Sequence, residues 1–149
     1  MLEIKSEENQ LGFASPTQND GVRSNQELHL ENLQITQKRI EELLEEEEED
    51  DDGMLRPTIA AFEQAVFLVN EAAKIMPSGF GKAWVVSDDK GGITLTWSRE
   101  TPAAEVRLIC HHSNPEKTYI YHEYGDDYAV VDPVDSGTLA DWLNWLNRV

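Results

Sequence analysis

The residues best suited to chemistry are Cys110, His111 and His112, followed further along the chain by His122 and Glu123. Zinc needs three or four such ligands that converge at about 2.0–2.3 Å. Neighbouring residues of a strand point to opposite faces, so His111 points away from Cys110, and only one strand register would bring His111 beside His122. The spacing matches no known ligand signature, and we assign no metal ligand. A small metal-binding protein or enzyme that uses the His111, His112 and His122 region stays an alternative.

Other catalytic signatures are missing from the sequence. Cys110 falls in an alternating stretch on the expected core face, where a free cysteine behaves as a small apolar residue. Gly91 and Gly92 lie in an expected β-hairpin, whereas a phosphate-binding loop joins a strand to a helix N-terminus. The acidic residues fall in turns or on solvent faces, so no carboxylate pair stands out for acid–base work. We therefore expect a protein that is not an enzyme, with no catalytic residue and no cofactor.

Composition narrows the class of partner. The chain has 149 residues, and 12 Lys+Arg against 29 Asp+Glu give a formal net charge of -17. Such a charge repels nucleic acids and anionic membranes and attracts a basic protein surface. The first residues, MLEIKSEENQ, lack the pattern of a secretory signal, and no apolar run approaches the roughly 20 residues of a membrane span. We expect a cytoplasmic protein that binds neither membranes nor nucleic acid directly.

Two regions of the chain differ in charge. Residues 1–56 hold 16 acidic and 5 basic side chains, whereas residues 57–149 hold 13 and 7. We interpret the first region as a polar acidic arm and the second as a compact domain. Within the arm, Met1–Ser24 is polar, without an apolar face, and is expected to be disordered. The acidic run Glu45–Asp52 is expected to be a solvated linker or a tether for a basic partner.

A helix is expected over residues 25–46 of the arm. Leu30, Leu33, Ile40 and Leu44 recur at the three-, four- and seven-residue spacings of one helical stripe. The stripe is too short for a strong autonomous coiled coil, which needs three to four heptads. It could pack on its own domain, pair with a second copy or bind a partner, and the sequence leaves these three open.

Residues 57–149 predict an α+β fold. Apolar residues recur every three or four positions from Ile59 to Met76, which predicts a helix that ends at Pro77. Short β-branched and aromatic segments follow, separated by turn residues, and they predict an antiparallel meander of four to five strands packed against two helices. The strands are expected over residues 82–87, 93–97, 105–111, 118–124 and 128–131, and the closing helix begins at Asp135 or Ser136.

This domain carries two recognisable motifs, the hairpin strand GGITLTW of residues 91–97 and the closing helix LADWL of residues 139–143. Residues 57–149 resemble a family of small uncharacterised bacterial proteins, well represented in cyanobacteria, that share both motifs. The resemblance implies a helix, a hairpin, further strands and a closing helix, and it carries over no functional residue. It also implies an association with toxin–antitoxin modules, which is a hint from analogy alone.

The candidate binding residues lie on the arm, the sheet and the closing helix. Arg107, Ile109, Tyr119 and Tyr121 alternate along their strands and are expected on a sheet face that the helices leave open. Trp145 lies off the centre of the apolar face of the closing helix. Eight residues are thus candidates for partner binding: Leu30, Leu33, Ile40, Leu44, Arg107, Tyr119, Tyr121 and Trp145.

These observations lead to a functional hypothesis and its rivals. We expect a non-catalytic interaction or regulatory protein, antitoxin-like in its role, that binds a protein with a basic surface. One rival is the small metal protein or enzyme described above. Another is a homo-oligomeric structural protein joined through the N-terminal helix or an exposed sheet edge.

Overall fold

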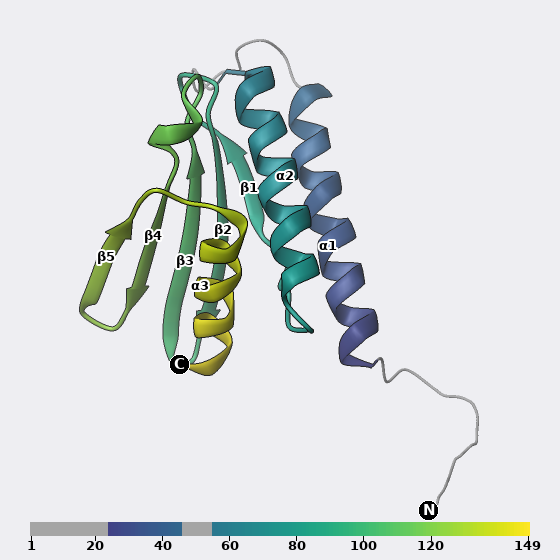
Figure 1. Ribbon diagram of the computed structural model, residues 1–149, viewed down its shortest axis with the longest axis vertical. Coiled ribbons are helices and arrows are strands. Elements are labelled where there is room, and N and C mark those ends of the chain that lie inside the picture. The colour runs from purple at the N-terminus through teal and green to yellow at the C-terminus, as the bar shows by residue number, and fades with distance from the viewer. Residues whose placement is uncertain (1–23, 46–54) are drawn as a thin grey trace, which may run out of the picture.

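The described part of the chain contains three α-helices. The structure is a computed structural model that describes residues 24–45 and 55–149 (Figure 1). Helix α1 spans Asn25–Glu42, α2 spans Ile59–Ile75 and α3 spans Ser136–Arg148. The expected disorder of Met1–Ser24 and the expected solvated run Glu45–Asp52 fall almost wholly outside the described residues.

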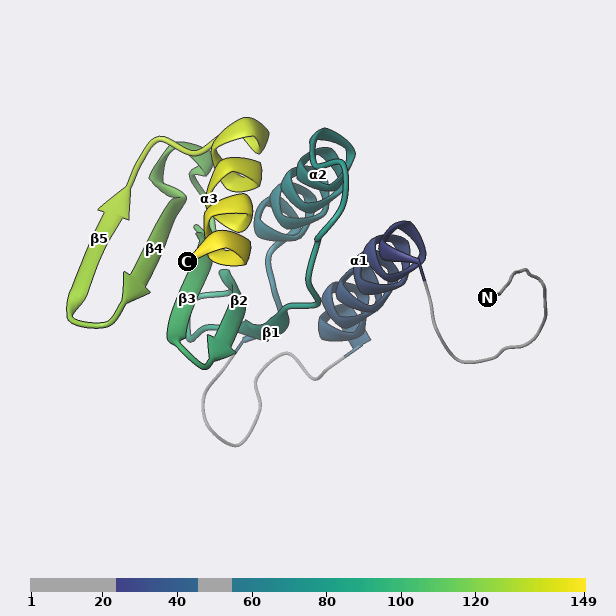
Figure 2. The same ribbon diagram turned by 90° about the horizontal axis from the view of Figure 1, so that it is seen from below.

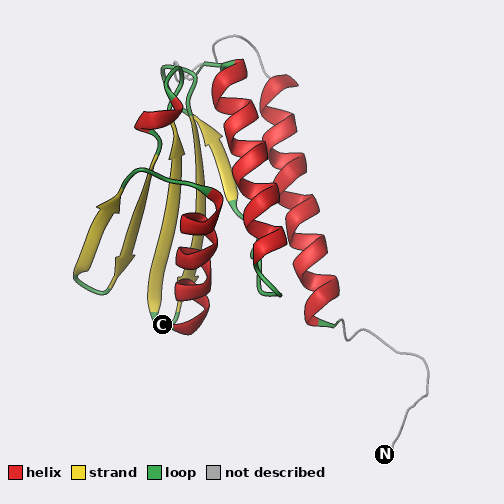
Figure 3. Cartoon of the chain, in the orientation of Figure 1, coloured by secondary structure: helices red, strands yellow, loops and turns green. Residues whose placement is uncertain are grey.

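Strands from the described residues form one five-stranded sheet in the order β1-β2-β3-β4-β5, each antiparallel to the next (Figure 3). The expected α+β fold with an antiparallel meander is thereby confirmed. The strands are β1 (Trp84–Ser87), β2 (Ile93–Glu100), β3 (Ala103–Cys110), β4 (Tyr119–Tyr124) and β5 (Asp127–Val131).

All three helices lie on the same side of the sheet (Figure 2). Helices α2 and α3 pack against each other and against the central strands, while α1 packs on α2 and reaches the edge strand β1. The opposite face of the sheet carries no element from the described residues (Figure 2). The domain therefore has two layers, one helical and one of strands, with the core between them.

The core follows the period-two pattern of the strands. Ile93, Leu95 and Trp97 of β2 are buried against the helices, and their neighbours Thr94 and Thr96 point to the other face. Strand β3 repeats the alternation. On α2 the most deeply buried side chains include several alanines, which let the helix approach the sheet closely: Ala61, Ala65, Ala72 and Ala73.

Helix α1 belongs to the packed domain rather than to a separate arm. Its first turn is closed by a capping box, in which the Ser24 hydroxyl accepts the Glu27 backbone N–H (3.1 Å) and the Glu27 carboxylate accepts the Ser24 backbone N–H (2.9 Å). Further along, Ile40 and Leu43 are buried in the same core as α2. The boundary expected at residue 57 thus differs from the structure, because these apolar side chains join the core across that boundary.

Polar side chains of α1 also hold the irregular segment that joins α2 to β1. His29 accepts the Phe80 backbone N–H at Nδ1 (3.1 Å), so its Nε2 carries the proton and donates to the Ala73 carbonyl (2.8 Å). Thr36 accepts the Ala83 backbone N–H (3.1 Å). These buried backbone groups have no strand partner, so the helix supplies the hydrogen bonds that they need. Two more α1 side chains donate to carbonyls of the segment, Asn32 and Arg39.

Candidate functional site

The uncovered sheet face presents a continuous row of side chains across all five strands. The strand registers align Trp84, Thr96, Arg107, Tyr121 and Val130, one residue from each strand. The side chains of Thr96, Arg107, Tyr121 and Val130 point away from the helices, because the residues on either side of each along the strand point toward the core side. Trp84 has the same parity on the edge strand, and the Arg39 side chain of α1 reaches over its ring. We call this surface the open face.

Several large apolar side chains are exposed on the open face. Trp84, Val86, Tyr128 and Val130 are 68%, 56%, 71% and 58% exposed. They come from β1 and β5, the two edge strands, so apolar groups flank the face on both sides. Between them lies a hollow of about 770 Å³ whose lining includes Thr94, Thr96, Arg107, Ile109, Tyr119 and Tyr121.

Polar contacts fix the side chains at the centre of the open face. Arg107 forms an ion pair with Glu105 and lies over the Tyr121 ring, 5.3 Å from its centroid. The Tyr121 hydroxyl donates to Glu123 Oε1 at 2.6 Å, and this hydrogen bond raises the pKa of the phenol. Tyr128 stacks on Tyr121 with their centroids 6.2 Å apart. The face is therefore a pre-organised aromatic surface with paired charges.

The structure brings together the candidate residues from the sheet but not those from α1. Arg107, Tyr119 and Tyr121 line the hollow on the open face. In contrast, Ile40 is fully buried in the core and cannot contact a partner. Leu33 packs half-buried against the core. The remaining two of the α1 stripe, Leu30 and Leu44, are exposed and half-buried, and neither lies on the sheet.

Trp145 is half-buried in an aromatic cluster between β4 and α3, rather than standing alone beside a helix end. It makes edge-to-face contacts with Trp142 (5.2 Å between centroids) and Tyr124 (6.4 Å). His122 stacks on Trp142 at 3.7 Å and lies edge-on to Trp145. The cluster joins the sheet to α3, so its first role is packing.

The histidines do not converge. His122 pairs with Val106 in the sheet and packs beneath α3, whereas His111 lies past the end of β3. There His111 stacks on His112 at 4.2 Å, and its Nδ1 accepts backbone N–H groups of the following turn. Within residues 24–45 and 55–149 no three metal-ligating side chains gather. Of the three histidines proposed as possible ligands, His111, His112 and His122, the first two lie next to each other and the third lies apart.

Stability should fall as the pH drops below about 6.5, the ordinary pKa of histidine, because of His122. Burial lowers the pKa of His122 in the folded protein. The unfolded chain therefore takes up this proton at a higher pH than the folded chain, and protonation favours unfolding. Urea unfolding at pH 7.5 and 5.0 measures the loss, and the variant His122→Gln should show a smaller one.

A nuclear magnetic resonance titration of the His122 ring tests the same cause directly. We expect a midpoint below that of a model histidine. A midpoint above it would mean that the attraction of a charged imidazole to the Trp142 ring outweighs burial, and the sign of the stability change would reverse.

The Cys110 thiol is buried, and burial raises its pKa to about 12. A thiol with that pKa is almost entirely protonated near neutral pH and therefore a poor nucleophile. It faces the core, away from the open face.

Sequence reasoning missed four side chains of the open face: Trp84, Val86, Tyr128 and Val130. A signal existed, because the hairpins that join β1 to β2 and β4 to β5 fix which residues of β1 and β5 share a face with those of the neighbouring strand.

Comparison with models of protein families, with curated proteins and with solved structures finds no match to this chain. None of its described helices is long and apolar enough to cross a membrane.

Proposed function

We propose that this protein is a non-catalytic interaction protein that binds a basic protein partner on its open face. The observation that carries the proposal is the set of exposed aromatic and aliphatic side chains there: Trp84, Val86, Tyr128 and Val130 are each more than half exposed. Large apolar side chains that are exposed together on one face are typical of interaction sites. Tyrosine, tryptophan and arginine are also enriched among the few residues that dominate the binding energy of protein interfaces.

Charge complementarity favours a basic partner. The carboxylates Asp88, Asp89, Glu105 and Glu123 lie on or beside the open face. Its cations are Arg107 at the centre and Arg39, which lies over Trp84 at one edge. The whole chain carries a formal net charge of -17. A field of this sign accelerates the approach of a positively charged surface and repels an acidic one.

An antitoxin-like role is a narrower form of this proposal, in which the basic partner is a toxin. Self-association is its rival. The outer edge of β5 and the open face could pair with a second copy, which would make the protein a homo-oligomer. Light scattering of the purified chain distinguishes the rival, because a monomer at micromolar concentration contradicts it.

The double variant Tyr128→Ser and Val130→Ser should weaken binding of a basic partner by at least about ten-fold, since truncation of an interface hot spot costs about 2 kcal/mol or more. The partner is first recovered from native lysate with the tagged full chain. Its dissociation constant is then measured by calorimetry with the purified partner at low and at moderate salt. Binding to the unaltered chain should weaken as salt rises, because salt screens the attraction between the two surfaces.

A matched control removes comparable apolar area from the helical layer. Phe67 and Ile75 of α2 are 60% and 55% exposed, and Phe67→Ser with Ile75→Ser leaves the sheet untouched. This control should bind the partner like the unaltered chain. Equal loss in both double variants, or no loss in the sheet variant, would refute the open face as the binding site.

A further inference from the structure

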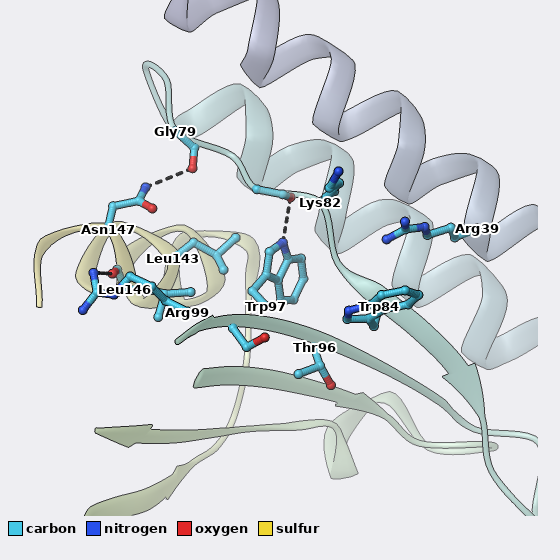
Figure 4. A pocket seen from close by; sticks show the side chains of 12 residues that line it. Arg39, Gly79, Lys82, Trp84, Thr96, Trp97, Arg99, Leu143, Leu146 and Asn147 are labelled. Atoms are coloured by element: carbon cyan, nitrogen blue, oxygen red, sulfur yellow. Dashed lines mark hydrogen bonds between the residues drawn. The ribbon is translucent and has the colours of Figure 1, made fainter. Parts of the chain in front are cut away.

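A second hollow, of about 450 Å³, lies where β2 continues past Trp84, the first residue of β1 (Figure 4). Strand β1 pairs with Ile93–Thr96, whereas β2 runs on to Glu100. The chain turns away at this point, so the last turn of α3 and the segment Gly79–Lys82 form the other walls. We call this hollow the basic pocket.

The charge of the basic pocket is opposite to that of the protein. Three cationic side chains line it, Arg39, Lys82 and Arg99, and no described lining residue is acidic. The chain as a whole has 29 acidic and 12 basic residues. None of the three forms an ion pair with a described residue. Three cations from three separate elements thus share one hollow without a counter-charge from the described chain.

The two guanidinium groups are held in place by neutral acceptors. Arg39 donates to the Ala83 carbonyl (2.6 Å) and lies 4.7 Å from the centroid of the Trp84 ring. Arg99 donates from Nε to the Pro102 carbonyl (3.2 Å) and from Nη1 to the Leu146 carbonyl (2.8 Å). Carbonyl oxygens orient a guanidinium but do not neutralise its charge.

The Arg99 guanidinium also has an unsatisfied hydrogen-bonding group. Its Nη2 is buried without a hydrogen-bond partner among the described residues. A partly buried cation without a counter-ion is costly, and an anion in the adjoining hollow would offset that cost. Because both arginines are already oriented, little side-chain entropy would be lost on binding such an anion.

The remaining walls suit a flat apolar body. Leu143, Leu146 and the edge of the buried Trp97 indole form the inner side, and Trp84 stands exposed at the mouth (Figure 4). Asn147 lies at the rim beside Gly79, whose carbonyl accepts from its amide (2.9 Å). Mostly apolar walls with a few converging polar groups are typical of small-molecule sites, whose volumes run from about 300 to 1,000 Å³.

We infer that the basic pocket binds a small organic anion, a carboxylate or phosphate carried on a planar ring. The oxyanion would lie among the three cations, where arginine can bind it with two parallel hydrogen bonds. The ring would rest against the leucine and indole walls. The net charge of the protein opposes this only weakly, because salt screens charges beyond about 8 Å. The pocket adjoins the open face and shares Trp84 and Thr96 with it, but its three cations lie outside the row that defines that face, and the anion is tested without any protein partner.

Calorimetry with four probes tests the class of ligand: benzoate, phenyl phosphate, inorganic phosphate and the uncharged benzamide. We expect benzoate or phenyl phosphate to bind with a dissociation constant in the millimolar range or tighter, and more tightly than benzamide and inorganic phosphate. Preference between the first two identifies the oxyanion. Binding of neither, or equal binding of benzamide, would overturn the proposal.

The position of the ligand is read from the indole N–H signals in a nitrogen-15 correlation spectrum. The chain has two tryptophans that line the basic pocket, Trp84 and Trp97. The other two, Trp142 and Trp145, lie outside the pocket, in the aromatic cluster between β4 and α3. Ligand should move the first pair and leave the second unchanged. Movement of the second pair alone would contradict the assignment.

Lys82→Met removes one cation from the basic pocket at an exposed position that makes no hydrogen bond with a described side chain or backbone group. We expect about five-fold weaker binding of the better probe, the effect of one unit charge at about 4 Å in water. The control Lys90→Met removes the same charge from the β1–β2 hairpin, outside the pocket, and should change binding by less than about two-fold. Equal affinity in both variants would refute the site.

Discussion

A chain that begins at residue 55 should be much less stable than one that begins at residue 24. The shorter chain lacks α1 and the short 3-10 turn after it, which place Ile40 and Leu43 in the core. Loss of such a side chain costs about 2–5 kcal/mol, and each buried backbone group left without a partner costs about 1–3 kcal/mol more. Phe80 and Ala83 would each lose the acceptor of their N–H. The total is comparable with the whole stability of a small domain, about 5–15 kcal/mol.

Thermal melts followed by circular dichroism test this expectation on three chains: 1–149, 24–149 and 55–149. We expect the first two to melt cooperatively, and the third to melt far lower or without a cooperative transition. The full-length variant His29→Leu isolates the polar part, because it leaves the Phe80 N–H and the Ala73 carbonyl unpaired while filling similar volume. A 55–149 chain as stable as 24–149 would mean that α1 is an accessory helix.

The sheet could be predicted from the sequence because a half-buried strand carries its own signal. Residues 93–97 alternate strictly, and so do residues 105–111, and both stretches are strands in the structure except for His111, which lies just past the end of β3. The turns between them contain Gly, Asn, Asp or Pro, which limits the length of each strand. The same alternation correctly assigned Arg107 and Tyr121 to the face away from the core.

The packing of α1 could not be predicted, because its buried face is partly polar. The apolar stripe through Leu30 and Leu44 suggested one face, whereas the face that packs on the domain includes His29 and Thr36. These two side chains are buried because the backbone between α2 and β1 needs their hydrogen bonds. Neither the spacing of apolar residues nor helix propensity gives information about these hydrogen bonds.

The basic pocket could not be predicted from the sequence either. Arg39, Lys82 and Arg99 stand on a helix, a loop and a strand that are far apart in the chain. No local sequence pattern connects these three residues, and a net negative charge gives no information about where cations gather in the folded chain. Only the packing of α1 beside β1, together with the late start of β1 at Trp84, brings the three together.

The variant Gly92→Ala should lose about 3 kcal/mol or more of folding stability. An added Cβ would lie 2.7 Å from the Cys110 carbonyl oxygen and 2.5 Å from Asp88 Oδ2. The carbonyl belongs to β3, which is held at this point by the pairing of Ile93 with Cys110. Asp88 accepts the backbone N–H groups of Lys90 and Gly92, both at 2.8 Å, so neither neighbour can move without breaking hydrogen bonds. Overpacking costs about 1–3 kcal/mol, and each broken bond adds about 1 kcal/mol.

The matched control for this steric cause is Gly125→Ala in the β4–β5 turn. Gly125 has φ +62° and no atom within 4 Å of an added Cβ, so its replacement carries only the cost of left-handed backbone, about 1–2 kcal/mol. Urea unfolding should therefore rank Gly92→Ala as the more destabilised of the two. The opposite order would mean that the close approach of β3 does not require a glycine in place of a larger residue at Gly92.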